Sequence, residues 1–145
     1  MPETASRHDP LTSFNFIVDF QGVRAGFAEI SGLTGENTVI EYREGDRPIH
    51  STKLPGQIKW GQIMLKRGFS QNGKDLWEWR KSVMEGHTKR LSGTITLLDE
   101  SQQPAMVWHI FEAWPCKWAG PAFNAKNNDI AIEELELAHE GLLLE

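Results

Sequence analysis

Alternation of apolar and polar positions marks the start of the chain as β-structure. Across residues 14–20 every second side chain, from Phe14 to Phe20, is aromatic or aliphatic, which is the period of a strand with one buried face. A turn at Gln21 and Gly22 separates it from a second apolar segment at 23–30. The parity of the apolar positions changes near Glu29, which predicts a bulge. We therefore expect the chain to begin with a β-hairpin.

Further along, four segments are patterned as strands and one as a helix. The strands are expected at 38–42, 58–67, 94–98 and 106–114, and the second of them changes parity after Gly61, as a bulged strand would. Residues 74–85 carry apolar side chains at helical spacing, with Leu76 and Trp79 on one face. Asn72 and Asp75 are spaced to cap the first turn of this helix.

Three segments have no single clear pattern. Residues 1–10 are polar and predict a flexible lead-in. Residues 43–57 are polar, with several Gly and Pro, and a loop of this length often contacts a partner. In residues 130–144, Glu133 and Leu135 favour a helix by propensity, whereas a strand with a parity shift after Ile132 is the alternative. With about seven strands and one helix, the chain predicts a mainly β (α+β) fold, a sandwich or barrel of two antiparallel sheets.

Length and charge narrow the class of protein. The 145 residues fit one domain, 1–145. The net charge of −5 argues against stable nucleic-acid binding, which needs basic side chains to neutralise phosphates. A single cysteine cannot form an internal disulfide, and no signal peptide or run of ~18 apolar residues is visible. We therefore expect folding in a cytoplasm and no membrane anchor.

Residue patterns typical of catalysis or of metal binding are not found. Cys116 has no histidine near it in sequence, and the five histidines are never two or four residues apart. The acidic residues at 133–136 read as a solvated face. We expect no catalytic residue, no metal ligand and no cofactor, so the chain is predicted not to be an enzyme. Trp108, Trp114 and Trp118 leave a carbohydrate-binding β-domain open as an alternative to packing.

Several segments, taken in order, resemble one known family. They are residues 27–33 (FAEISGL), the turn at 55–56 (PG), residues 65–68 (LKRG), residues 76–79 (LWEW), residues 113–121 (AWPCKWAGP) with Asn124 and Ala125, and residues 131–141 (AIEELELAHEG). The set resembles the T4-like phage tail tube family, and more narrowly the inner tube proteins of extracellular contractile injection systems such as antifeeding-prophage-like particles. Glu112 stands where many relatives have Asn.

The resemblance implies a structural role. Six subunits would close into a ring, and stacked rings would form a hollow tube that contraction of a sheath drives through a target membrane. The implied partners are further copies, the sheath protein, a baseplate hub and spike, a tube cap or terminator, and a lumen cargo or tape-measure protein. The tube would be assembled in the producer cytoplasm and would become part of a phage tail or phage-tail-like particle. A baseplate-proximal ring that initiates the tube is the alternative. The resemblance also implies that the final segment is a strand.

Three groups of residues are predicted to carry these roles. The inter-subunit loop at 43–57 is expected to act through Arg43, Glu44, Asp46, Arg47, Pro48, His50, Lys53, Pro55 and Gly56. Packing or interface contacts are expected from Trp79, Trp108, Trp114, Pro115, Lys117 and Trp118. The candidates for a neutral to acidic lumen wall are Asp19, Glu41, Glu133, Glu134 and Glu136.

Overall fold

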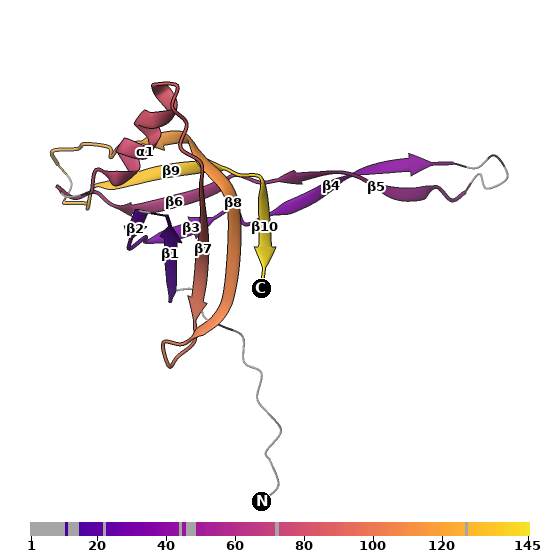
Figure 1. The fold of residues 1–145 in the computed structure, drawn as a ribbon, viewed down its shortest axis with the longest axis horizontal. Helices are drawn as coiled ribbons and strands as arrows, with labels where there is room; N and C mark the ends of the chain where they lie inside the picture. The colour runs from indigo at the N-terminus through magenta and orange to yellow at the C-terminus, as the bar shows by residue number, and fades with distance from the viewer. Residues whose placement is uncertain are drawn as a thin grey trace, which may run out of the picture.

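A computed structural model describes residues 11, 15–21, 23–43, 45, 49–71, 73–126 and 128–145. Within this part of the chain there are ten strands and one helix (Figure 1). In chain order they are β1 (Phe16–Phe20), β2 (Val23–Ala25), β3 (Glu29–Ser31), β4 (Gly35–Tyr42), β5 (Thr52–Trp60), β6 (Ile63–Gly68), α1 (Asp75–Met84), β7 (Leu91–Leu98), β8 (Pro104–Ala119), β9 (Ile132–Ala138) and β10 (Gly141–Leu144).

Eight strands form one continuous antiparallel sheet that folds into two layers. The first layer has the order β2-β1-β7-β8, with β10 also paired to β8, and the second has the order β8-β9-β6-β3. The 16-residue β8 belongs to both layers, and Figure 1 shows it curving from the direction of β7 to that of β9. At this bend Glu112 adopts a left-handed backbone with φ of 51°. Bulged or bent strands of this kind make the corners of orthogonal sandwiches.

The core lies between the two layers and under the helix. It consists of the buried residues Val18, Phe20, Val23, Ile63, Leu65, Leu76, Trp79, Leu91, Ile95, Ile110, Ala113, Leu135 and Leu137. On β6 and β9 buried residues alternate with partly exposed ones, as expected for strands with one face on a core. Helix α1 contributes Leu76 and Trp79, and the indole of Trp79 donates a hydrogen bond to the Lys89 carbonyl at 2.7 Å.

The two expected bulges are in fact places where one strand ends and the next pairs with a different neighbour. The segment at 23–30 splits into β2, which pairs with β1, and β3, which pairs with β6. Likewise the segment at 58–67 splits at Gly61 into the end of β5 and the start of β6. A shift of the apolar residues from one set of alternate positions to the other looks the same in sequence whether it comes from a bulge or from a break between two strands. Both insert residues that interrupt the alternation of side chains between the two faces.

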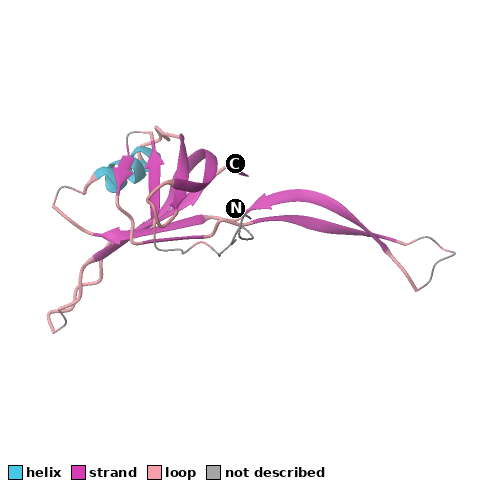
Figure 2. Ribbon diagram, turned by 90° about the horizontal axis from the view of Figure 1, so that it is seen from below, coloured by secondary structure: helices cyan, strands magenta, loops and turns pink. Residues whose placement is uncertain are grey.

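The predicted loop at 43–57 is wrong in its second half, because Thr52–Trp60 is strand β5. It pairs with β4 to form a two-stranded hairpin, which we call the arm. Figures 1 and 2 show the arm running away from the body as a long twisted ribbon. Pro55 and Gly56, which suggested a loop, lie in β5 beside a register irregularity between Asn37 and Val39. A bulged strand that is not central in a sheet tolerates both residues.

Two further expectations have clear outcomes. The propensity-based helix at 130–144 is wrong, because these residues form β9 and β10, the structure implied by the family resemblance. Pairing with β6 and β8 overrides helix propensity here. At the start of α1, Lys74 is the N-cap residue and makes no side-chain cap hydrogen bond, and Asp75 bonds to Arg67. Asn72 lies outside the described residues.

Candidate assembly surfaces

The arm leaves the body through a narrow neck built on glycines. Gly32 has φ of 88°, and a Cβ on it would lie 2.1 Å from the carbonyl oxygen of Gln62. A Cβ on Gly61 would lie 2.0 Å from the Thr34 hydroxyl oxygen, and the Gly61 amide donates to the Thr34 carbonyl at 3.0 Å. The two chain segments therefore cross at a distance that only glycine permits. Across the neck, the ring of His139 packs near Trp60 and its Nε2 lies 2.9 Å from the Gly61 carbonyl.

The arm is exposed over most of its length, including all eight residues of β4, while Gly56 and Trp60 of β5 are half-buried. In its distal half one face is apolar, and the other carries a charged pair next to the apolar Val39. Ile40 pairs with Leu54, and Tyr42 lies on the same face, with exposed fractions of 50%, 46% and 55%. The neighbouring pair Glu41 and Lys53 occupies the opposite face. A two-stranded ribbon with exposed apolar side chains is not self-sufficient in water, so this surface needs a partner.

The predicted assembly residues that the structure describes lie either near the far end of the arm or on β5. Arg43 and His50 are exposed near the tip, while Lys53 and Pro55 are exposed on β5 and Gly56 is half-buried there. The Gly56 carbonyl accepts a hydrogen bond from the Asn37 amide group at 3.1 Å, which ties the two strands together. Glu44, Asp46, Arg47 and Pro48 lie outside the described residues. The apolar residues Ile40, Tyr42 and Leu54 were missed as assembly residues, although the strand predicted at 38–42 already placed Ile40 and Tyr42 on one face.

The outward face of the second layer is polar and of mixed charge. Cross-strand register places Glu29, Lys66 and Glu134 in one row and Glu136 beside Lys117 in the next. Lys66 Nζ lies 3.7 Å from a Glu29 carboxylate oxygen and 3.5 Å from one of Glu134. Three carboxylates against two ammonium groups give this face a formal charge of −1. We call it the polar face.

The structure does not bring the candidate lumen residues together. Glu134 and Glu136 lie on the polar face, whereas Asp19 is on the exposed face of β1 and Glu41 is on the arm. Glu133 is fully buried, so its assignment to a water-filled lumen is wrong. The alternation of β9 puts Glu133 on the core side together with Leu135 and Leu137, and a pattern that counts only apolar residues misses this.

Glu133 belongs to a buried charge network that joins the second layer to the helix. Its carboxylate accepts hydrogen bonds from Arg67 Nε at 2.5 Å and from the Trp118 indole at 3.1 Å. Arg67 also pairs with Asp75 at the start of α1 and donates to the Gly73 carbonyl at 2.9 Å. Burial opposes the charge of Arg67, but its bonds to Asp75 and Glu133 outweigh burial and raise the pKa of Arg67. Such a network holds the helix start at one position on the sheet.

The predicted packing residues lie in separate parts of the fold and contact different neighbours. Trp79 is buried against Phe20, with ring centroids 5.6 Å apart, and Pro115 is buried within β8. Trp118 packs against Trp77 at 4.9 Å, and Lys117 is exposed on the polar face. Strand β8 continues through Trp118, beyond the end at 114 expected from the sequence. Trp114 is half-buried there.

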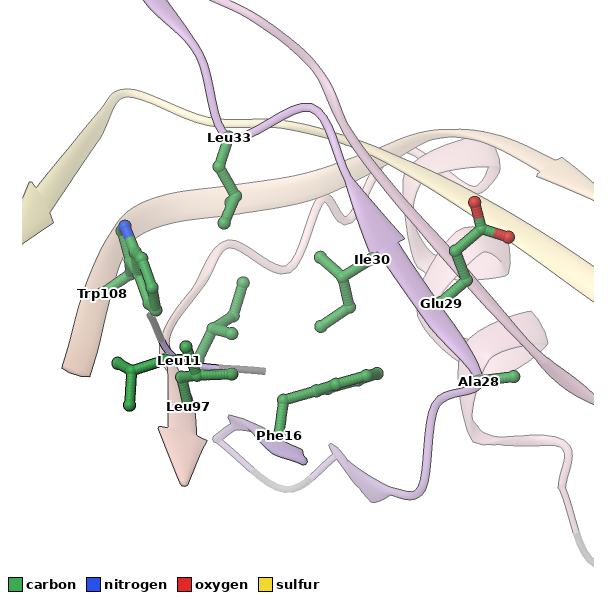
Figure 3. Close-up of a pocket in the computed structure, with 9 residues that line it drawn as sticks. Leu11, Phe16, Ala28, Glu29, Ile30, Leu33, Leu97 and Trp108 are labelled. Atoms are coloured by element: carbon green, nitrogen blue, oxygen red, sulfur yellow. The ribbon is translucent and has the colours of Figure 1, made fainter. Parts of the chain in front are cut away.

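An apolar groove opens at the end of the body where the first layer extends beyond the second. Its volume is about 500 Å³, and its walls include Phe16, Ile30, Leu33, Leu97 and Trp108 (Figure 3). The first-layer residues Phe16, Leu97 and Trp108 are on the core-facing side of their strands but are only half-buried, because the described residues of the second layer cover them only in part. Trp108 and Trp118 therefore line different cavities, and no single tryptophan platform is formed.

Chemistry typical of an active site is not seen among the described residues. Burial, together with the charge of Glu136, raises the pKa of the Cys116 thiol, which makes it a poorer nucleophile. Within the same residues no group of three His, Cys, Asp or Glu side chains is placed to hold a metal ion. None of the described helices has the length and apolarity to cross a bilayer.

Comparisons with known proteins agree on one family. Residues 12–143 match the family described as T4-like virus tail tube protein gp19. A chain of the extended sheath-tube complex of PVC, an extracellular contractile injection system, superposes with a TM-score of 0.86 at 28% identity, covering 94% of this chain and 91% of that one. A chain of the PVC sheath/tube terminator gives 0.88 at 28% identity, with 97% and 99% covered. A chain of the anti-feeding prophage baseplate gives 0.86 at 25% identity, with 96% and 97% covered.

No curated protein matches the sequence significantly. The family match spans nearly the whole chain, and the structural neighbours share the two layers, the helix and nearly the full length. The chain therefore belongs to the T4-like virus tail tube protein gp19 family and is a structural tube protein of the phage-tail-like, contractile injection type.

Proposed function

We propose that the chain is the inner tube subunit of a contractile injection system or phage tail. Six copies close into a ring, rings stack into a hollow rigid tube, and contraction of a surrounding sheath drives the tube through a target membrane. The arm carries this proposal, because a long ribbon with exposed apolar residues has nothing to pack against on its own body. Pairing of free strand edges between copies would remove the remaining open edges of the sheets.

The partners and location follow from the same proposal. Rings stack head to tail, so the contact repeats and produces a filament. The sheath protein covers the outside, a baseplate hub with its spike binds one end, and a cap or terminator closes the other. The lumen holds a cargo or tape-measure protein. Assembly takes place in the producer cytoplasm, and the finished tube is part of an extracellular particle. No step requires this chain to make or break a covalent bond.

The polar face supports an assignment of the lumen wall. Helix α1 and the first layer cover the opposite side of the second layer, so the polar face is open to solvent in the described part of the chain. A wall of closely paired charges, with a formal −1 per subunit, would let acidic polymers slide without sticking.

The arm can be tested by removing it at a natural closing point. Asn37 and Ile58 face each other across the arm, so residues 38–57 can be replaced by an Asn-Gly turn. We expect the wild-type protein to sediment at six times its 16.4 kDa mass or as larger stacks, and to form rings or tubes in negative-stain micrographs. The shortened variant should keep its β-sheet circular dichroism and stay monomeric. A wild-type protein that remains a monomer at tens of micromolar would refute the proposal.

A baseplate-proximal ring that initiates the tube is the second candidate. The observation that favours it is the similarity to a chain of the anti-feeding prophage baseplate at 25% identity. The same micrographs separate the two candidates. A tube subunit should give stacks whose length grows with concentration, whereas an initiator should stop at single rings and elongate only when a second tube protein is added.

A further inference from the structure

Strand β10 is a short strand with a histidine contact at each end. Its four residues, Gly141–Leu144, pair with β8 alone among the described strands (Figure 1). Leu142 packs against the core, whereas Leu143 and Leu144 are about half exposed. A short strand paired on one side buries little apolar surface, so it detaches more easily than a long central strand. The side-chain contacts at its two ends therefore matter for its attachment.

At the start of β10, the two ring nitrogens of His139 both face hydrogen-bond acceptors. Nε2 lies 2.9 Å from the Gly61 carbonyl oxygen at the neck, and Nδ1 lies 3.2 Å from the Gly141 carbonyl oxygen. A carbonyl oxygen only accepts hydrogen bonds, and a neutral imidazole has a single N–H to donate. Both contacts are therefore hydrogen bonds only when the ring carries its second proton. The Trp60 ring, with its centroid 6.0 Å away, is an aromatic neighbour that also favours a cation.

At the other end of β10, His109 makes a second contact that protonation strengthens. Its Nε2 lies 2.6 Å from a carboxylate oxygen of Glu145, the residue after the strand. The backbone N–H of Glu145 donates to the Val107 carbonyl at 2.9 Å, so pairing with β8 extends to this residue. A carboxylate bonds more strongly to an imidazolium than to a neutral imidazole. Because this pair is exposed to solvent, its contribution is the smaller of the two.

The other charged groups near His139 do not replace these contacts. Glu140 follows it in the chain and pairs instead with Arg90 at 3.4 Å. Lys59 on β5 and Glu112 on β8 are exposed. No ion pair joins His139 to a carboxylate in the described part of the chain. Its two carbonyl contacts are therefore the polar contacts that depend on its protonation.

Around His109 one further carboxylate lies in the same cross-strand row. The row runs from His109 through Thr94 on β7 to Asp19 on β1. Asp19 is thus two strands away from the ring, whereas Glu145 is in direct contact with it. The pair with Glu145 is therefore the contact at this end of β10 that a change in protonation alters most.

We propose that β10 is a pH-sensitive edge strand, held on β8 at both ends by protonated histidines and loosened when these histidines lose their protons. Histidine side chains change charge between about pH 5 and 8. The attached strand binds the protonated rings, so it is held most firmly in mild acid, and its attachment weakens as pH rises through this range. Release uncovers the β8 edge at Trp108–Phe111, an open edge available for pairing. The proposal goes beyond the tube role and does not depend on it, because these contacts lie within one chain.

Hydrogen exchange of the full-length chain, measured by mass spectrometry, tests the proposal. The protection of the β10 amides is compared at about pH 5.5 and about pH 8.5, after correction for the intrinsic effect of pH on exchange. We expect wild-type protection to fall about tenfold or more, because loss of a hydrogen bond to a charged group commonly changes an equilibrium by that factor. Peptides from β9 are the internal reference and should keep their protection. Sedimentation at both pH values establishes that the assembly state is the same.

Substitutions assign the effect to the two rings. Glutamine cannot gain a proton, so His139→Gln should remove most of the pH dependence, His109→Gln a smaller part, and the double variant all of it. His87→Gln is the matched control, because His87 is exposed in the connection between α1 and β7, and it should behave like wild type. Circular dichroism establishes that each variant is folded, and His139→Asn is the second choice if His139→Gln is not.

Three results would overturn the proposal. The first is β10 protection in the wild type that does not change with pH. The second is a change with pH that persists in the double variant. The third is a pH dependence that either single substitution abolishes completely, because the strand would then be held at one end only.

Discussion

At the scale of single residues, the contribution of a charged side chain to stability depends on whether it is buried or exposed. Glu133 and Glu134 are neighbours on β9 with similar sequence surroundings, yet one is fully buried and the other is on the polar face. Glu133 is held by Arg67 and Trp118, and among the described residues no buried side-chain nitrogen or oxygen is without a hydrogen-bond partner. Removing one member of such a set leaves the remaining buried charges without a partner, which destabilises the fold.

Replacing Glu133 should therefore destabilise the fold strongly. Glu133→Ala leaves the Arg67 guanidinium buried with one partner fewer, and we expect a loss of about 3–5 kcal/mol in the free energy of unfolding. Glu134→Ala, the matched control, removes a solvent-exposed pair with Lys66 and should cost about 0–1 kcal/mol. Urea denaturation of both variants, compared in the same assembly state, checks this. Equal losses for the two would show that the buried network contributes nothing beyond a surface pair.

Glu112 is a second residue whose role only its backbone reveals. With φ of 51° at the bend of β8, it occupies a region that costs a residue with a side chain about 1–2 kcal/mol relative to glycine. Glu112→Gly should raise the free energy of unfolding by up to about 1 kcal/mol, and Glu112→Asn by less. Glu112→Gln, which removes the charge alone, should change little. A gain from Glu112→Gln as large as that from Glu112→Gly would attribute the effect to charge and contradict the backbone explanation.

At the scale of elements, one ribbon performs two tasks. Strands β3 and β6 pair within the body, and β4 and β5 continue the same two chain segments outward as the arm. The glycines of the neck make this continuation possible without a loop. The body and the arm are therefore joined by a short, closely packed crossing and not by a flexible hinge.

The neck predicts a sharp difference between two glycines that are close in sequence. Gly32→Ala places a Cβ against the Gln62 carbonyl at a left-handed φ and should cost about 1–2 kcal/mol or more. Gly26→Ala meets no atom within 4 Å and should be neutral or stabilising by up to about 1 kcal/mol. Thermal unfolding gives the comparison, and negative-stain micrographs would show whether Gly32→Ala also disturbs rings. Similar melting temperatures for both variants would contradict the prediction, because they would mean that the backbone of the neck accommodates the added Cβ without loss of stability.

At the scale of the whole molecule, the two faces of the second layer differ in kind. One is sealed by the first layer and the helix, and the other displays Lys66 and Lys117 among three carboxylates. If the polar face lines the tube, its charge decides what the lumen retains. Only side chains on the wall matter, because ions screen fields beyond about 8 Å at physiological salt.

Reversing charge on the polar face should make the tube bind anions. We expect tubes of Glu134→Lys with Glu136→Lys to retain short single-stranded DNA at low salt and to release it as salt rises, while wild-type tubes retain little. The control Asp19→Lys with Glu100→Lys makes the same charge change on exposed residues away from that face. Co-sedimentation measures retention. Equal retention by both variants, or a cryo-microscopy map with a lumen lined mainly by Lys and Arg, would contradict the assignment.

The sequence alone determined the fold class, the family and the helix. Alternation predicted most strands because a half-buried sheet imposes a two-residue period, and ordered short motifs pointed to the tube family. Helix α1 begins and ends one residue inside the predicted 74–85 because its apolar spacing is local.

The tertiary structure decided what local pattern cannot encode. A parity change at Glu29 or Gly61 is compatible with a bulge or with a break between two strands, and only the partners of β3 and β6 distinguish the two. The final segment has helical propensity, but pairing along β6 and β8 makes it two strands. Glu133 looked like surface charge because its partner Arg67 is 66 residues away in sequence. The second half of the arm looked like a loop because β5 has no core to alternate against and contains Pro55 and Gly56.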